Sequence, residues 1–161
     1  MRIASDIAGG MAFLHHSCNP PIVHRDLKSP NILLASEDPD DVVAKIADFG
    51  TAVKLFSLLK GQSANARLVE NPTWLSPEVL SGEHYGPLSD VYPYGIMLWE
   101  LLKMEHPFDE YQYRFNSELE EAIKMGIRPT IPEDCPKSLK TLMESVWDVA
   151  NKRPTYKEIT K

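Results

Sequence analysis

The sequence is poor in cysteine, and its positive charges are outnumbered by negative ones. Its 161 residues include only 2 cysteines, Cys18 and Cys135, which lie far apart and outside any CxxC spacing. A disulfide framework and a zinc ribbon are therefore not indicated. Lys and Arg number 17 against 23 Asp and Glu, giving a net charge of -6. This balance argues against nucleic-acid binding, because a phosphate backbone requires clustered cations.

Long apolar runs are also missing. No stretch approaches the roughly 20 apolar residues that cross a bilayer, so we expect no membrane span. Near the start of the chain, Asp6 and the glycines at 9–10 interrupt the one apolar stretch that could resemble a signal peptide. Together with the low cysteine content, these absences predict a soluble protein of the reducing cytoplasm.

One group of potential metal ligands is present near the start. His15, His16 and Cys18 stand close together in the sequence. A structural zinc site needs a second group of ligands at a matching spacing, and the sequence has none. We therefore favour the end of a helix over a metal site here.

The apolar pattern predicts a helical domain with a single core. Hydrophobic residues make up 43% of the chain, enough for one compact unit. Helical spacing over residues 3–14 predicts an amphipathic helix. The segment SDVYPYGIMLWELL, residues 89–102, is apolar nearly all round and predicts a central helix. Further helices are expected at 117–125, 137–149 and 155–161.

A small β element is also predicted. Short apolar segments at 32–35 and 42–47 flank the acidic turn SEDPDD, a pattern typical of two strands joined by a solvated loop. After Asp48 comes a polar stretch, which we expect to be an irregular functional loop. The predicted fold class is thus mainly α with a small β element.

The segment IVHRDLKSPNILL, residues 22–34, places a polar insert between apolar flanks. The insert comprises His24, Arg25, Asp26, Lys28 and Asn31. Holding so many polar groups near a core costs free energy unless they are paired. A turn capped by Asp and Asn would explain part of the insert, but the pattern favours a functional loop.

The insert resembles the catalytic loop of protein kinases. Residues 24–31 carry the His-Arg-Asp, Lys and Asn of that loop, and Asp-Phe-Gly at 48–50 follows as the family's metal-binding turn does. Glu78, Asp90 and Arg153 continue the resemblance in the family's order. Separated motifs in the right order are far more specific than one tripeptide. The sequence HRDLKSPN, residues 24–31, is most like that of the tyrosine-kinase-like group of Ser/Thr kinases.

The resemblance implies a protein-kinase-like C-terminal lobe and ATP-dependent phosphorylation of protein Ser or Thr. Lys28 is the form seen in Ser/Thr kinases, while tyrosine or dual specificity stays open. Residues 1–161 would be a partial kinase domain. Its parts would be the catalytic loop at 24–31, the Asp-Phe-Gly turn at 48–50, the activation segment at 48–78 and the helical subdomain at 79–161.

Roles at the site are likewise implied by the resemblance. Asp26 would orient the acceptor hydroxyl, and Lys28 would place a positive charge on the transferred phosphate. Asn31 and Asp48 offer the hard oxygen ligands that magnesium prefers. The resemblance places Leu33, Met97 and Leu101 beneath the adenine ring and onto the central helix, and we expect all three to be core residues first. The implied cofactors are ATP and Mg²⁺, and the implied partner is a protein substrate.

The remaining motif residues have structural or regulatory expectations. His24 and Phe49 would pack in the column that orders the site, with Gly50 completing the turn. Arg25 either receives a phosphate on the activation segment, at Ser57 or Ser63, or bonds local carbonyls, and both alternatives stay open. By the same resemblance we expect an ion pair between Glu78 and Arg153. Asp90, at the start of the central helix, is expected to have a structural role.

Several features depart from the family pattern. Asn71 stands where most Ser/Thr kinases have a Thr that bridges the catalytic Asp and Lys, and the interval from Trp147 to Arg153 is one residue short. No Gly-rich loop, strand Lys or helix Glu of the smaller lobe occurs in these 161 residues. We expect the N-terminal lobe upstream and negligible activity without it. A regulatory docking module or a fragment without an independent role are the alternatives.

Overall fold

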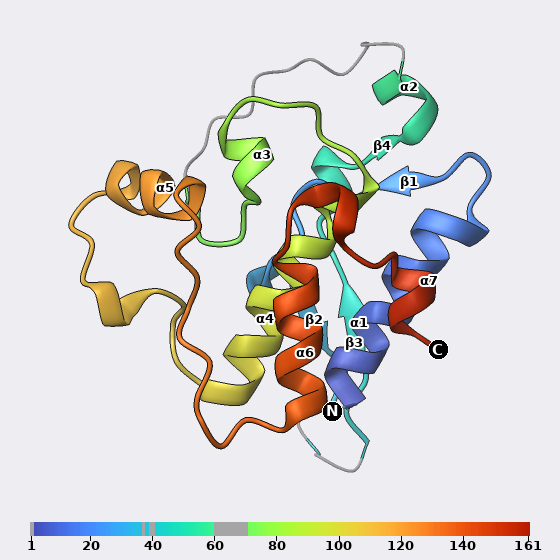
Figure 1. The fold of residues 1–161 in the computed structure, drawn as a ribbon. Coiled ribbons are helices and arrows are strands. Elements are labelled where there is room, and N and C mark those ends of the chain that lie inside the picture. Colours follow the sequence, from blue (N-terminus) through green and yellow to red (C-terminus); the bar gives the residue numbers. More distant parts are fainter. Residues whose placement is uncertain (1, 37, 39–40, 60–70) are drawn as a thin grey trace.

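A computed structural model of the chain describes residues 2–36, 38, 41–59 and 71–161, and its body is helical (Figure 1). The central helix α4 packs against α6, while α1 packs against β3 and α7. The helices are α1 Arg2–Ala12, α2 Leu55–Leu59, α3 Pro77–Leu80, α4 Val91–Lys103, α5 Asn116–Lys124, α6 Lys137–Val146 and α7 Tyr156–Ile159. None of the described helices combines the length and apolar character needed to cross a membrane.

The strands form two antiparallel pairs that position the loops between them. The strands are β1 Ile22–Val23, β2 Ile32–Leu34, β3 Ala44–Ile46 and β4 Val53–Lys54. In the first pair Ile22 faces Lys54, and in the second Ile32 faces Ile46. The polar insert therefore lies between β1 and β2, and the Asp-Phe-Gly turn follows β3. The predicted class, mainly α with a small β element, is confirmed.

Helix α4 forms the centre of the core. Every side chain from Val91 to Trp99 is buried, which explains why its sequence is apolar nearly all round. Pro93 falls in the first turn, where its missing N–H removes no helical bond. Position 95 has no room for a side chain, because a Cβ added to Gly95 would lie 2.5 Å from both Trp147 Nε1 and Val146 Cγ2.

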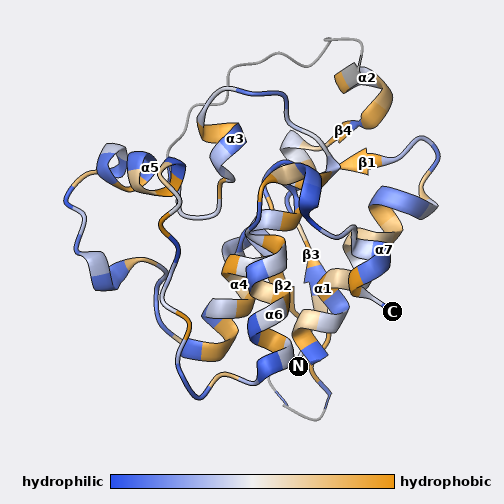
Figure 2. Cartoon of the chain, viewed as in Figure 1, coloured by the Kyte–Doolittle hydropathy of each residue, from blue (hydrophilic) through white to orange (hydrophobic). Residues whose placement is uncertain are grey.

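Local differences from the sequence prediction have physical causes. The helix expected at 137–149 ends at Val146. The strand pair β1 and β4 was not predicted, because two-residue strands are too short to show an alternation. Helix α2 lies in the stretch expected to be irregular, and its hydrophobic residues stand at the edge of the molecule (Figure 2). Phe56 of this helix is exposed.

Candidate active site

The catalytic-loop backbone is fixed by one buried carboxylate. Asp90, at the start of α4, is fully buried and accepts hydrogen bonds from the backbone N–H groups of His24 (2.8 Å) and Arg25 (2.9 Å). His15 Nε2 lies 2.9 Å from Asp90 Oδ2, and the Tyr85 hydroxyl donates at 2.7 Å to Oδ1. His15 is therefore a buried histidine near the end of a helical segment, Phe13–Ser17, as the helix-end interpretation expects.

Asp26 stands at the centre of the polar insert. Its side chain is nearly buried, and Oδ2 lies 2.9 Å from Lys28 Nζ. Asn31 Nδ2 donates to the same Oδ2 at 3.1 Å and to the Asp26 carbonyl at 2.7 Å. The structure thus brings together the three residues to which the sequence assigned the chemistry. Because the Asn31 amide nitrogen makes these bonds, its Oδ1 oxygen is left as the possible ligand atom.

The Asp-Phe-Gly turn lies directly beside the insert. The Ala47 N–H donates to the Asn31 carbonyl at 2.8 Å, so Asp48 follows a residue held against the catalytic loop. Asp48 has a left-handed backbone with φ of 58°, and its Oδ1 accepts from the Gly50 N–H at 3.2 Å. The Asp48 side chain is exposed. An exposed carboxylate and a nearby amide oxygen form a donor set that suits a hard cation.

His24 links the loop to this turn. It is fully buried, and its Nε2–H donates to the Ala47 carbonyl at 3.0 Å. The Phe49 ring packs edge-on against the imidazole, with centroids 5.0 Å apart. Phe49 is nevertheless 47% exposed. Phe49 thus contacts His24 while about half of its surface stays open in the described part of the chain.

Arg25 has a local bonding partner. Its backbone is left-handed, with φ of 67°, and its Nε donates to the Thr51 carbonyl at 2.6 Å. The Thr51 hydroxyl in turn donates to the His24 carbonyl at 3.1 Å. The local-carbonyl alternative is thus present in the structure. For the phosphate alternative, Ser57 lies in α2, whereas Ser63 lies outside the described residues.

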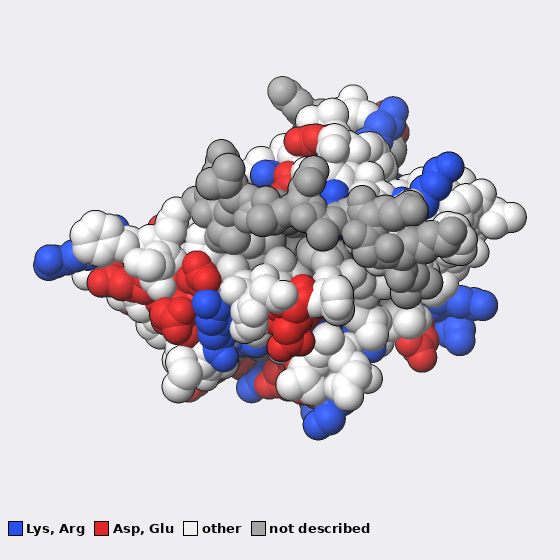
Figure 3. Space-filling model, turned by 90° about the horizontal axis from the view of Figure 1, so that it is seen from above, with Lys and Arg blue, Asp and Glu red and all other residues white. Residues whose placement is uncertain are grey.

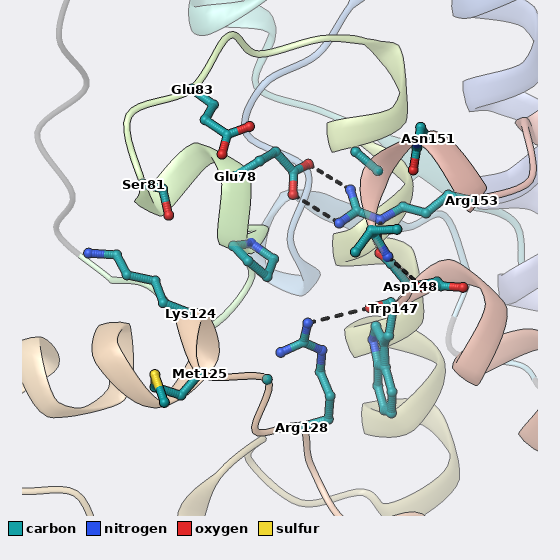
Figure 4. Close-up of a pocket in the computed structure, with 14 residues that line it drawn as sticks. Glu78, Ser81, Glu83, Lys124, Met125, Arg128, Trp147, Asp148, Asn151 and Arg153 are labelled. Atoms are coloured by element: carbon teal, nitrogen blue, oxygen red, sulfur yellow. Dashed lines mark hydrogen bonds and ion pairs between the residues drawn. The ribbon is translucent and has the colours of Figure 1, made fainter.

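The predicted ion pair between Glu78 and Arg153 is confirmed. Arg153 NH1 and NH2 donate to the two Glu78 oxygens at 2.7 and 2.9 Å, and Figure 4 shows this fork at one wall of a cavity of about 730 Å³. Burial alone would raise the pKa of Glu78, but the hydrogen bonds and charge of Arg153 outweigh it and hold that pKa below its usual value. The short interval before Arg153 does not prevent the contact.

The apolar floor differs in part from expectation. Leu33 is 58% exposed, so the interpretation of Leu33 as a core residue is wrong. Met97 is buried, as expected of a core residue, so only part of the floor around Leu33 and Met97 is open to water. A cavity of about 450 Å³ lies beside this floor, lined by Ile32, Leu34, Met97 and Leu101 among others. Leu33 and Leu34 are thus the exposed apolar side chains that β2 contributes.

Sequence reasoning missed a second carboxylate near the loop. Glu100 of α4 accepts hydrogen bonds from the Ser29 hydroxyl and from Trp74 Nε1. Ser29 lies inside the recognised motif, but its type alone carries no signal for this partner. The Oδ1 of Asn71 accepts hydrogen bonds from the N–H and hydroxyl of Thr73, at 3.0 and 2.7 Å.

One face of the molecule carries charges of both signs. In the face seen in Figure 3, acidic and basic side chains are interspersed around the atoms drawn in grey. Among the described residues, no group of three or more His, Cys, Asp and Glu side chains is arranged to hold a metal ion. Any cation at this site therefore requires the amide of Asn31 or further ligands in addition to Asp48.

The fold and the loop geometry together define the larger lobe of a protein kinase. A family model described as protein tyrosine and serine/threonine kinase matches residues 1–161, and the chain belongs to this family. The family resemblance expected from the motifs is therefore confirmed, and the match covers residues 1–161.

Relatives from Dictyostelium discoideum support the family assignment. The probable serine/threonine-protein kinase roco8 is 45% identical over 100% of this chain and 8% of its own length. Cyclic GMP-binding protein C is 49% identical over 100% of this chain and 6% of its own length. The dual specificity protein kinase shkA is 35% identical over 99% of this chain and 29% of its own length. The chain spans only a small part of these relatives.

Proposed function

We propose that this chain is the C-terminal lobe of a protein kinase that transfers the γ-phosphoryl group of ATP to Ser or Thr hydroxyls of a protein. The observation that carries the proposal is the Asp26 carboxylate, nearly buried and bonded to both Lys28 and Asn31. A docking module has no physical need for a charged cluster of this kind. The proposed parts are the catalytic loop at 24–31, the Asp-Phe-Gly turn at 48–50, the activation segment at 48–78 and the helical subdomain at 79–161.

Asp26 and Lys28 divide the chemistry between them. Phosphoryl transfer spreads negative charge over the transferred oxygens, so the site must supply positive charge and an oriented acceptor. We assign Asp26 to accept the hydrogen bond of the acceptor hydroxyl and so to direct its lone pair. Lys28, held 2.9 Å from that carboxylate, brings its charge to the same place.

Asn31 and Asp48 are the residues that would hold Mg²⁺. Their oxygens are hard ligands. The Asp48 carboxylate is exposed, and the residue before it, Ala47, is hydrogen-bonded through its N–H to the Asn31 carbonyl. When bound, the ion would neutralise phosphate charge. His24 and Phe49 act indirectly, because their ring contact fixes the turn that carries Asp48.

The exposed floor on β2 is the place that we assign to the adenine end of ATP. Leu33 is open there, and the adjacent apolar cavity includes Ile32 and Leu34. These 161 residues contain no Gly-rich loop or strand Lys, so we propose that an upstream lobe completes the pocket. Positioning supplies most of the rate of phosphoryl transfer, and residues 1–161 alone should therefore be inactive. We place the protein in the cytoplasm on its low cysteine content.

The test compares residues 1–161 with the longer protein that includes the upstream lobe. Phosphate transfer from radiolabelled ATP to myelin basic protein is measured for the wild type, Asp26→Asn and Asp48→Asn, with the exposed Asp134→Asn as the matched control. The longer wild type and the control should transfer phosphate, while both site variants should lose at least about 100-fold.

Binding of Mg-ATP separates the two roles. Asp26→Asn should retain Mg-ATP affinity, measured by calorimetry, and Asp48→Asn should lose it, because only the latter removes a proposed metal ligand. Robust transfer by residues 1–161 alone would contradict the incomplete-pocket proposal. A longer protein that neither binds Mg-ATP nor transfers phosphate would support the docking module instead.

A further inference from the structure

A cavity of about 730 Å³ lies apart from the proposed catalytic cluster. Three segments form its walls: α3 with the residues that follow it, the C-terminal end of α5, and the turn between α6 and Arg153 (Figure 4). None of the residues proposed to act on phosphate or magnesium lines it. A hollow of this volume has the size of a typical ligand pocket. Any role of this cavity is therefore separate from the proposed chemistry.

Large apolar side chains are exposed on two of these walls. Met125, at the C-terminal end of α5, is 82% exposed, and Val149, after α6, is 58% exposed. The buried ring of Trp147 also lines the cavity. Val149 belongs to the interval before Arg153 that is one residue short, so the family pattern does not account for this wall. Exposed apolar side chains that border a hollow are typical of a surface that a partner covers.

The guanidinium of Arg128 brings a positive charge to this cavity. It donates to three backbone carbonyls, at distances from 2.7 to 3.4 Å, and its Cζ lies 5.0 Å from the centroid of the Tyr92 ring. Within the part of the chain that the structure describes, its Nε–H is buried without a hydrogen-bond partner, and no carboxylate forms an ion pair with it. The other cations of the cavity are already paired, Arg153 with Glu78 and Lys124 with two glutamates of its own helix.

The carboxylates that line the cavity are bonded or lie away from Arg128. Glu78 is neutralised by the fork described above, and Asp148 Oδ1 accepts from the N–H of the next residue at 2.7 Å. Figure 4 shows Glu83 on the α3 side, at the opposite end of the view from Arg128. The Arg128 end of the cavity thus complements a negative charge on a partner.

We infer that this cavity docks a segment of a partner protein that presents a Glu or Asp carboxylate beside an apolar side chain. The carboxylate pairs with the Arg128 guanidinium, whose planar donors match the oxygens of a carboxylate. The apolar side chain covers Met125 and Val149 and removes their exposed surface from water. A protein segment is favoured over a free anion because the charge and the apolar walls lie in one cavity.

The experiment measures peptide binding to the longer protein with its upstream lobe. The probes are fluorescein-labelled Ala-Phe-Glu-Leu-Ala and the same peptide with glutamine in place of glutamate, and N-acetylglutamate serves as a competitor without an apolar side chain. Fluorescence anisotropy gives the dissociation constants. The glutamate peptide should bind at least about tenfold more tightly than the glutamine peptide, because a hydrogen bond to a charged group contributes more than one to a neutral group.

Variants at the two walls separate the charge from the apolar contact. In Arg128→Gln the two peptides should bind within about twofold of each other, because the charge that distinguishes them is gone. Met125→Ser should weaken both peptides about three- to tenfold and keep the preference for glutamate, because it removes only apolar contact. Met125 is largely exposed, so this variant, with the comparison of the two peptides, decides if Arg128→Gln does not fold.

Phe115→Ser is the matched control. Phe115 is 67% exposed at the N-terminal end of the same helix and does not line this cavity. Its substitution removes as large an exposed apolar side chain as the Met125 variant does. Both peptides should bind to Phe115→Ser with wild-type affinity.

The outcomes decide both parts of the inference. Equal affinity of the wild type for the two peptides, or unchanged binding in Met125→Ser, would overturn the docking site. Displacement of the peptide by an equal concentration of N-acetylglutamate would assign the cavity to a free carboxylate and overturn the protein segment as its occupant. Loss of the glutamate preference in Arg128→Gln, with weaker binding in Met125→Ser, supports the inference. Phosphate transfer plays no part in these measurements, so the docking site and the proposed function can fail separately.

Discussion

Single buried residues decide how the site-bearing loops are attached to the helical body. Arg153 is nearly fully buried and forms a fork with Glu78, and it also donates to the Leu88 carbonyl at 3.0 Å and the Asp148 carbonyl at 2.8 Å. One guanidinium therefore connects α3 to the turn before α7. Such a pair is valuable mainly because loss of one partner leaves a buried charge without compensation.

Removal of Arg153 should destabilise the chain strongly. We expect Arg153→Met to lower the free energy of unfolding by about 3 kcal/mol, since the Glu78 carboxylate would remain buried and unpaired. Lys103→Met is the control, because its partner Glu105 is largely exposed, and it should change stability by less than about 0.5 kcal/mol. Urea unfolding of the longer protein measures both. A loss equal to that of the control would mean that the fork contributes little.

The same pair should make stability depend on pH. Arg153 holds the Glu78 pKa below its usual value of 4.5, so the unfolded chain binds a proton at higher pH than the folded chain does. The contribution of Glu78 is complete above that usual value and is lost as the pH falls through the lower folded pKa. The difference in unfolding free energy between wild type and Arg153→Met should therefore shrink between pH 6 and about pH 3. A constant difference over this range would argue against the ionic origin.

At the scale of elements, the packing of α4 against α6 depends on the absence of a side chain. An added Cβ at Gly95 would meet the Trp147 ring and Val146 within 3 Å. We expect Gly95→Ala to destabilise by about 1 to 3 kcal/mol through overpacking. Gly9→Ala in α1 is the matched control, because nothing lies within 4 Å of the added atom. Alanine there should stabilise by up to about 1 kcal/mol. Thermal unfolding of both variants gives the comparison, and equal effects would contradict it.

The elements that could be predicted from the sequence are those with a long or repeated pattern. Helix α4 and the strands β2 and β3 follow from their apolar runs, since burial on all sides or between turns leaves a clear trace. The pairing of β1 with β4 depends on backbone bonds between distant residues, which side-chain pattern does not encode. Helix α2 was missed because its five residues are too few for a helical period.

The candidate site was predictable to the extent that its residues form local motifs. Asp26, Lys28 and Asn31 lie within six residues, and the structure brings them together. The bonds of Glu100 join residues 71 and 26 positions away in the sequence, so no local pattern could reveal them. The exposure of Leu33 could not be predicted from the sequence either, because a leucine in a strand does not indicate which residues pack against it.

At the scale of the whole molecule, an exposed apolar face should govern how residues 1–161 behave when isolated. Leu33 and Leu34 are each more than half exposed, and Met104 is 83% exposed. Phe49 of the Asp-Phe-Gly turn is 47% exposed. Exposed apolar side chains promote association when they lie together on a surface. We expect concentration-dependent self-association of residues 1–161 in sedimentation experiments. The longer protein, with its upstream lobe, should show less, and a strictly monomeric isolated chain would contradict the expectation.

The carboxylate of Asp90 affects the entropy cost of the long-range contacts that form as the chain folds. It binds His15, His24 and Arg25, which precede it by 75, 66 and 65 residues. Joining the ends of a flexible loop of that length costs about 4 kcal/mol in chain entropy. Since the three partners are near one another in sequence, the first bond that forms brings the others within reach. The entropy of closing the loop is therefore lost once, and each later bond to Asp90 forms between groups that are already neighbours.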